Sequence, residues 1–195
     1  MITFREYLSE TPFAEYGNYV SEDGEDLTGT KINKQKYKFV EDLEFENNKI
    51  SLYENNREYL ITQKDSEIII FNMKFSNYNK LENTIQIKYI FTLEKFRTKG
   101  LSSIIYKFLV LNKKFIILSD GQQYLGARKL WARLSKDDNL TIDLIDYSTG
   151  KILEQNIKLE HGKTNNDFDL KYYTNNYNKM NNYINLRFLL RERHA

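Results

Sequence analysis

The 195-residue sequence contains no cysteine, a single proline and two histidines. The absence of cysteine excludes disulfide bonds, thiolate metal ligands and thiol nucleophiles, and it fits a reducing compartment. The two histidines, His161 and His194, both come late in the chain. We therefore expect neither a histidine-based metal site nor a histidine-based catalytic triad.

Long hydrophobic runs are also missing. No stretch approaches the roughly 18 apolar residues of a membrane-spanning helix, and the N-terminus lacks the apolar core of a secretory signal. The net charge is only +2, which creates no global field toward nucleic acid or a membrane surface. The sequence therefore predicts a cytoplasmic globular protein with no membrane partner, for which nucleic acid is an unlikely partner.

The sequence from residue 37 onward contains segments rich in β-branched and aromatic residues, separated by short polar turns. This pattern predicts a β-meander, and two later segments with apolar residues at helical spacing predict helices. In chain order, the expected elements are strands at 37–45, 49–55, 58–64, 67–75 and 84–93, a helix at 100–112, a strand at 114–120, a helix at 123–136, a hairpin at 140–156 and a strand at 183–192.

This order predicts an α+β fold with a mixed, mostly antiparallel sheet around a central parallel β-α-β unit. The meander forms the N-terminal part of the sheet and the hairpin its C-terminal part. We divide the chain into an N-terminal helix or arm with a linker (1–36), a main domain (37–156) and a C-terminal extension (157–195). We expect the extension to complete the same domain.

A basic turn, Arg97-Thr98-Lys99-Gly100, joins the predicted strand at 84–93 directly to the following helix. The first N–H groups of a helix lack partners, and together with the helix dipole they attract anions. Gly100 permits close approach of a ligand to the backbone, and the basic side chains add positive charge. These features favour a pyrophosphate site. The alternative is a plain joint between a strand and a helix, with the basic side chains in solvent.

The stretch Arg97-Thr98-Lys99-Gly100-Leu101-Ser102 resembles the [Q/R]-x-x-G-x-[G/A] turn of the GNAT family of N-acetyltransferases. In that family the amides of the turn hold the pyrophosphate of acetyl-CoA. Ser102 departs from the usual Gly or Ala. The resemblance covers roughly residues 37–155 and implies a GNAT-like fold.

A second match lies on the helix at 123–136, where the family often carries N-x-x-A-x-x-L-Y-x-K. Ala127 and Leu130 fit this motif, and Arg133 stands at the place of the Lys. Tyr124 replaces the Asn that often contacts the cofactor. Trp131 replaces the Tyr that often protonates the leaving thiolate, and an indole N–H is no normal general acid. For Leu130 and Trp131, core packing is the alternative role.

The resemblance implies an acyl-CoA-dependent N-acyltransferase that transfers an acetyl group from acetyl-CoA directly to an amine of a protein or small molecule. It assigns Asp120 as the base and Tyr124 as a substitute acid, and it involves no metal. Capping of the following helix is the alternative role for Asp120. The residues that it assigns to acetyl-CoA binding are Thr92, Leu93, Arg97, Thr98, Lys99, Gly100, Leu101 and Ser102.

The first ten residues, MITFREYLSE, resemble the capsid-targeting peptide of internal head proteins in T4-like bacteriophages. Those peptides end in Leu/Ile-x-Glu, where the prohead protease cuts, and Leu8-Ser9-Glu10 supplies that ending. The resemblance implies a protein packaged in a phage head, trimmed after Glu10 and injected into the host cell, where a host protein is the target. The alternative is a short docking helix that is never removed.

Three functions therefore stay open. The first is the N-acyltransferase. The second is a non-catalytic GNAT-like binding protein, such as a packaged phage protein that inhibits a host defence system, or a part of the phage head. The third is nucleic-acid binding through the interleaved basic and aromatic residues of 171–188, which the near-neutral charge disfavours. Binding of acetyl-CoA, or a splay between the strands at 84–93 and 114–120, would distinguish the first from the second.

Overall fold

The computed structural model describes residues 26–46, 48–97, 99–119, 125–159 and 186–193. The N-terminal decapeptide and most of the segment 157–182 lie outside these residues. In chain order, the elements are β1 (Lys38–Phe45), β2 (Asn48–Glu54), β3 (Glu58–Gln63), β4 (Ile69–Asn77), β5 (Thr84–Thr92), the 3₁₀ turn η1 (Glu94–Phe96), α2 (Leu101–Leu111), β6 (Ile116–Leu118), α3 (Leu125–Leu134), β7 (Leu140–Asp146), β8 (Ile152–Glu154) and β9 (Leu186–Glu192).

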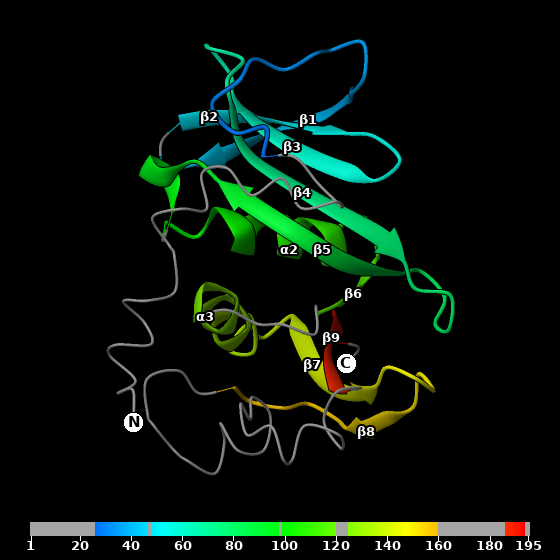
Figure 1. Cartoon of the computed structure of the whole chain (residues 1–195). Coiled ribbons are helices and arrows are strands. Elements are labelled where there is room, and N and C mark those ends of the chain that lie inside the picture. Colours follow the sequence, from blue (N-terminus) through cyan, green and yellow to red (C-terminus); the bar gives the residue numbers. More distant parts are fainter. Residues whose placement is uncertain (1–25, 47, 98, 120–124, 160–185, 194–195) are drawn as a thin grey trace, which may run out of the picture.

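The described strands form one nine-stranded sheet in the order β1-β2-β3-β4-β5-β6-β9-β7-β8 (Figure 1). The neighbouring strands are antiparallel, except that β5 and β6 run parallel, joined by α2. The predicted α+β class is therefore confirmed, with its N-terminal meander, its central parallel β-α-β unit and its C-terminal hairpin. None of the described helices is both long and apolar enough to cross a membrane.

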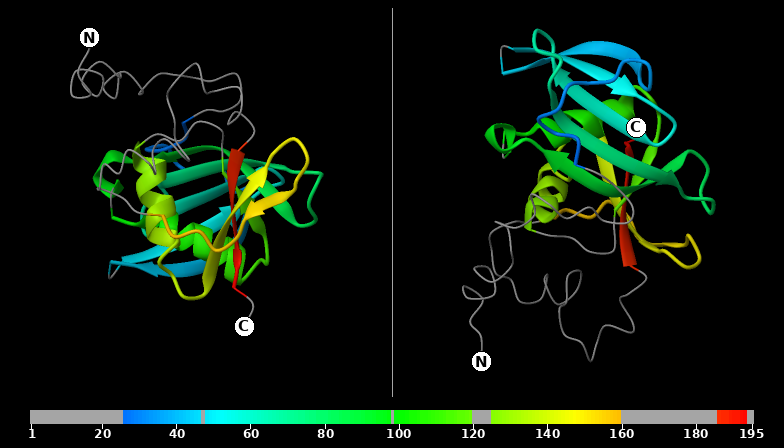
Figure 2. Two further views of the ribbon diagram at one scale, coloured as in Figure 1. Left: turned by 90° about the horizontal axis from the view of Figure 1, so that it is seen from below. Right: turned by 45° about the horizontal axis from the view of Figure 1, so that its top comes forward.

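The sequence did not predict which strands meet at the centre of the sheet. Strand β6 covers only three residues of the predicted strand at 114–120, and β9 lies between β6 and β7. Figure 2 shows β9 beside β7 in both views. Sheet position depends on tertiary packing, which residue periodicity along a strand does not report. The middle of the sheet is thus completed by a strand that is remote in sequence.

Both described helices pack on one face of the sheet. Apolar residues at helical spacing on α2, including Leu101, Ile105 and Leu109, are buried there. Helix α3 buries Trp131, whose ring meets Tyr106 edge-on at a centroid distance of 5.9 Å. These side chains join the sheet residues in one large hydrophobic cluster, which forms the main core.

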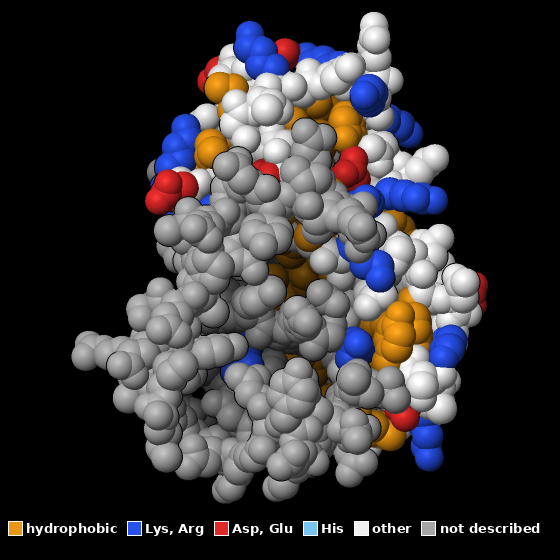
Figure 3. Space-filling view, viewed as in Figure 1, with side chains coloured by type: hydrophobic (Ala, Val, Ile, Leu, Met, Phe, Trp, Pro, Cys, Tyr) orange, Lys and Arg blue, Asp and Glu red, His pale blue; other side chains and the backbone are white. Residues whose placement is uncertain are grey.

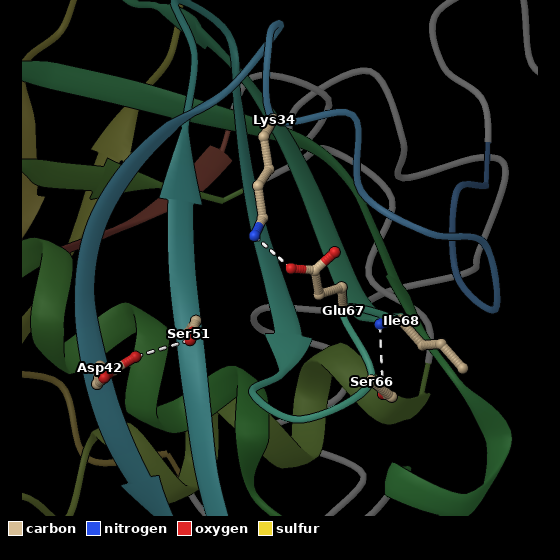
Figure 4. A network of polar contacts seen from close by, with 6 residues as sticks. All are labelled: Lys34, Asp42, Ser51, Ser66, Glu67 and Ile68. Carbon is tan, nitrogen blue, oxygen red and sulfur yellow. Dashed lines mark hydrogen bonds and ion pairs between the residues drawn. The ribbon is translucent and has the colours of Figure 1, made fainter.

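The opposite face of the sheet is partly covered by residues 26–37. Ile32 packs there with Tyr53, Leu60 and Ile69 in a second buried cluster. Backbone bonds attach this segment to the start of β4, because the Ile69 N–H donates to the Thr30 oxygen at 2.8 Å. The Lys34 ammonium also pairs with the Glu67 carboxylate (Figure 4). The described end of the predicted linker is therefore packed against the sheet.

On this opposite face, the turn between β4 and β5 packs against the turn between β7 and β8. The rings of Tyr78 and Tyr147 stack with a centroid distance of 5.1 Å, and the Tyr78 hydroxyl donates to the Tyr147 carbonyl at 2.6 Å. The Arg187 guanidinium lies 4.9 Å from the centroid of the Tyr147 ring. Burial raises the pKa of the Tyr78 phenol, which keeps it protonated as a donor. This contact therefore holds the two turns together.

Candidate cofactor site at the start of helix α2

The candidate site lies beyond the described pairing of β5 with β6, where β5 leads to α2. The two strands pair only from Thr84↔Ile116 to Gln86↔Leu118, so within the described residues the second half of β5 has no partner on this side. After Leu118 the chain bonds to β9, because the Ser119 N–H donates to the Phe188 oxygen at 2.8 Å. The described pairing of β5 with β6 therefore ends at Gln86, and residues 120–124 lie outside the described residues.

A β-bulge on β5 lies just beyond its described pairing with β6. Opposite β4 the register changes from Lys74↔Tyr89 to Phe75↔Ile87, which leaves Lys88 as the extra residue. A bulge bends its strand and increases the local twist. The second half of β5 therefore runs in a different direction from the first half.

The residues of β5 beyond the bulge are only half-buried, in contrast to the first four residues of the strand, which are buried. They include Ile90, Phe91 and Thr92, and half-buried Leu93 follows them. Thr92 lies opposite Phe71 of β4, and the Leu93 N–H donates to the Ile70 oxygen at 2.9 Å. The N–H of Leu93 is therefore engaged by β4, and its carbonyl accepts the Phe96 N–H at 2.8 Å, so the backbone of Leu93 is held on both sides.

Gly100 is the N-cap of α2 and has a φ of 96°, in the left-handed region that glycine adopts without strain. The N–H groups of Ser103 and Ile104 donate to its carbonyl at 2.9 and 3.3 Å. The N–H groups of Leu101 and Ser102 belong to the first turn of the helix, where no earlier helical carbonyl can accept them. The turn thus combines the geometry and the donors of an anion site.

Arg133 of α3 reaches the same place. A Cβ built on Gly100 would lie 2.9 Å from Nη1 of Arg133. The Arg133 side chain is exposed, and within the described residues its guanidinium has no carboxylate partner. A positive charge beside the positive end of a helix dipole is unfavourable until an anion joins them. The sequence motif placed Arg133 where the family carries Lys, but sequence reasoning assigned it no role.

The two basic residues of the turn, Arg97 and Lys99, bind other groups of the protein. Nε of Arg97 donates to the carbonyl of Thr92 at 3.0 Å, which fastens the turn to the end of β5. The Lys99 ammonium pairs with Glu46 at 3.0 Å and lies 5.7 Å from the centroid of the Phe96 ring. Both predicted cations therefore hold the turn in place, while Arg133 is the cation that the structure sets against Gly100.

The serines at the start of α2 differ in exposure. Ser102 is half-buried, whereas Ser103 is buried with only 7% of its surface exposed. Within the described part of the chain, the hydroxyl of Ser103 has no hydrogen-bond partner. Leu101 is buried in the main core, so only its backbone can contribute to the site. The predicted binding residues thus divide into backbone donors and anchoring side chains.

The two predicted catalytic residues, Asp120 and Tyr124, lie outside the described residues, and so does Thr98. Ser119, next to Asp120, is buried, and its hydroxyl accepts the Phe188 N–H at 2.9 Å. Trp131 is 2% exposed and packs in the core, as its structural interpretation expects. Among the described residues, no group of three or more His, Cys, Asp or Glu side chains could hold a metal ion.

The comparisons with known proteins add little to this geometry. No protein-family model and no curated protein matches the chain. Among solved structures, the chain is similar to the IAA acetyltransferase from Bacillus cereus ATCC 14579, with 14% sequence identity and a TM-score of 0.35. That similarity covers 73% of this chain and 78% of the other. A likeness of this size carries no argument for function.

Proposed function

We propose that the chain is a GNAT-like N-acyltransferase that transfers an acetyl group from acetyl-CoA to an amine of a protein or small molecule. One observation carries the proposal: the half-buried second half of β5, beyond its described pairing with β6, leads through η1 to the start of α2 at Gly100. This arrangement combines an open strand end with an anion-attracting helix end. A long ligand with a pyrophosphate and an acyl group requires both.

The residues present fit a pyrophosphate. Gly100 has no side chain to obstruct it, and the first N–H groups of α2 are donors suited to phosphate oxygens. The Arg133 guanidinium adds a planar set of donors that matches phosphate geometry. Phosphate would also compensate the charge that Arg133 now brings to the positive end of α2. We assign the pyrophosphate of acetyl-CoA to this turn.

The acyl end of the cofactor would lie along the second half of β5, on the edge away from β4. Bound acetyl-CoA would supply an activated thioester carbonyl. The protein would hold this carbonyl beside Thr92 and Leu93 and orient the amine that attacks it. We propose that Asp120 accepts the proton of the amine, directly or through water, and that Tyr124 donates a proton to the leaving sulfur. Trp131 is excluded from this role because its ring is enclosed in the core.

The N-terminal decapeptide carries a separate proposal. We propose a phage-encoded protein whose N-terminal decapeptide directs it to the head and is removed after Glu10. The alternative function is a non-catalytic GNAT-like protein that inhibits a host defence system. The second function needs the fold but does not need bound acetyl-CoA, so cofactor binding separates the two.

Replacing Gly100 with glutamate should abolish the binding of acetyl-CoA. The new side chain would meet the Arg133 guanidinium and place a negative charge where the pyrophosphate is proposed to lie. Calorimetric titration of acetyl-CoA into the wild type and the variant measures the effect. A left-handed φ strains any side chain at Gly100 by about 1–2 kcal/mol, so thermal melting must show that the variant is folded.

Gly150→Glu is the matched control. Gly150 also has a positive φ, 75°, but it lies in the turn between β7 and β8, where a Cβ would meet Lys80 and Tyr78 and none of the proposed binding residues. This variant carries similar backbone strain and the same added charge, and it should bind acetyl-CoA within about twofold of the wild type. A folded wild-type protein that does not bind acetyl-CoA would reject the proposed function and favour the non-catalytic alternative.

Arg133→Met should weaken acetyl-CoA binding by roughly tenfold or more, because a charge-assisted hydrogen bond contributes about 1.5–3 kcal/mol. The same change should leave the free protein at least as stable, since it removes a positive charge from the start of α2. Calorimetry and urea unfolding measure the two effects. Lys129→Met, an exposed change on the same helix, serves as the control. Equal losses of affinity in both variants would show that Arg133 acts only through the net charge of α3 and makes no specific contact with the cofactor.

A further inference from the structure

A second candidate site lies at the β2–β3 turn, apart from the start of α2. An open cavity of about 840 Å³ is formed there by the segment before β1, the turn itself and β4. None of the residues proposed for acetyl-CoA lines it. The cavity therefore needs an explanation of its own.

The lining is strongly cationic although the whole chain is nearly neutral. Five of the lining residues are Lys or Arg, against two carboxylates. Three of these cations, Lys36, Lys38 and Arg57, are exposed, and within the described residues their side chains form no ion pair or hydrogen bond. Figure 3 shows Lys and Arg side chains gathered at its upper right, over this end of the sheet. The cavity thus holds positive charge that the described part of the protein does not neutralise.

The two carboxylates of the lining already have partners of their own. Glu58 accepts the hydroxyl of Tyr37 at 2.7 Å, that of Tyr89 at 3.0 Å and the side-chain amide of Asn55 at 3.2 Å. These donors are neutral, so they fix the carboxylate without consuming any of the cations. Glu58 therefore joins three parts of the chain, namely the segment before β1, the β2–β3 turn and β5.

Glu54 is paired from outside the cavity. Its carboxylate meets the Lys113 ammonium, which comes from the loop after α2, at 3.2 Å. Lys34 pairs with Glu67, a residue that does not line the cavity, and this pair fixes the position of the Lys34 ammonium. Within the described residues, the neighbouring Lys36 and Lys38 form no ion pair. The Lys74 ammonium lies 5.8 Å from the centroid of the Tyr89 ring, which holds it in the wall. Both carboxylates of the lining thus have their own partners, and the side chains of Lys34 and Lys74 are held in position.

We propose that this cavity binds a chain of phosphate groups, as found in a nucleoside triphosphate or in a nucleic-acid backbone. A chain of phosphates carries several closely spaced negative charges, so it can face several cations at once, and Arg57 and the lysines supply both a planar fork and compact point charges. A ligand with one charge would leave most of the cations unpaired. The proposal is independent of the N-acyltransferase.

Titration of sodium tripolyphosphate into the full chain tests the proposal. At about 50 mM salt, calorimetry should show saturable binding that weakens steeply as salt rises. In the double variant Lys38→Gln/Arg57→Gln, affinity should fall by about tenfold or more. Both side chains are exposed, so the variant should melt at the temperature of the wild type.

The double variant Lys136→Gln/Lys151→Gln is the matched control, because it removes the same charge at two exposed sites outside the cavity. It should bind tripolyphosphate within about twofold of the wild type. A ten-nucleotide oligothymidylate, followed by fluorescence anisotropy, identifies the source. If it binds more tightly than tripolyphosphate and loses affinity in the cavity variant, the source is a nucleic-acid strand. If it binds no better, the source is a free nucleotide.

Three results would overturn the proposal. The first is a folded chain that shows no saturable binding of either phosphate probe. The second is an equal loss of affinity in the cavity variant and the control variant. The third is tighter binding of an oligoglutamate peptide than of tripolyphosphate, which would make the cavity a site for acidic protein segments.

Discussion

Trp131→Ala should lower the free energy of unfolding by about 3–5 kcal/mol, which is the cost of truncating a large aromatic ring in a packed core. The Trp131 side chain is 2% exposed. Its ring contacts Tyr106 of α2 and lies 5.8 Å from the ring of Phe188 in β9, measured between centroids. The truncation would therefore loosen both helices and a central strand together. Urea unfolding followed by circular dichroism measures the loss.

Leu153→Ala is the control for this change. Leu153 lies on the edge strand β8 with 49% of its surface exposed, so its truncation should alter the free energy of unfolding by no more than about 0.5 kcal/mol. Trp131→Phe should lie between the two, because it keeps an aromatic ring in the same place. If Trp131→Ala lowered the free energy of unfolding by less than about 1 kcal/mol, the core position of Trp131 would be contradicted. Trp131 would then again be a candidate catalytic residue.

Arg191→Met should destabilise the fold by about 3 kcal/mol, because it leaves a buried carboxylate without its cation. The Asp143 side chain is fully buried. Its two oxygens accept Nε of Arg191 at 2.7 Å and the Asn156 N–H at 2.9 Å. The pair joins β7 to β9 and fixes the chain that follows β8. The midpoint and slope of urea unfolding measure the effect.

Two further variants make this test specific. Lys114→Met removes an exposed partner of Glu192, the residue next to Arg191 in β9, and it should cost at most about 1 kcal/mol. Asp143→Leu combined with Arg191→Met removes both charges, so it should be more stable than Arg191→Met alone. If all three variants lose equal stability, the ion pair contributes no more than a surface contact would.

The sequence was sufficient to predict the meander and its limits. Strands β1 to β5 begin and end within two residues of their predicted bounds, because the polar turns between them interrupt a clear β pattern. The position of β9 was not predictable in this way. Its residues read as a strand, but the place between β6 and β7 follows from the packing of Phe188 and Leu190 into the common core.

The candidate site was predicted in part. The turn before α2 and the role of Gly100 follow from local rules, since a strand that enters a helix through a glycine leaves free donors. The partners of Arg97 and Lys99 depend on Thr92 and Glu46, which no local rule connects to the turn. Arg133 needed the packing of α3 against α2, although the motif marked its position. The predictions for Asp120 and Tyr124 stay untested.

The place of β9 also determines when the protein can fold. Ribosomes deliver the chain from its N-terminus, and β9 begins only at Leu186, after β7 and β8. Until Glu192 has emerged, β6 and β7 have no strand between them, and their edges are open to pairing with other chains. The meander of β1 to β5 can form earlier from contacts close in sequence. We therefore expect the sheet to be completed only when β9 has emerged, with the nascent chain most prone to aggregation just before that point.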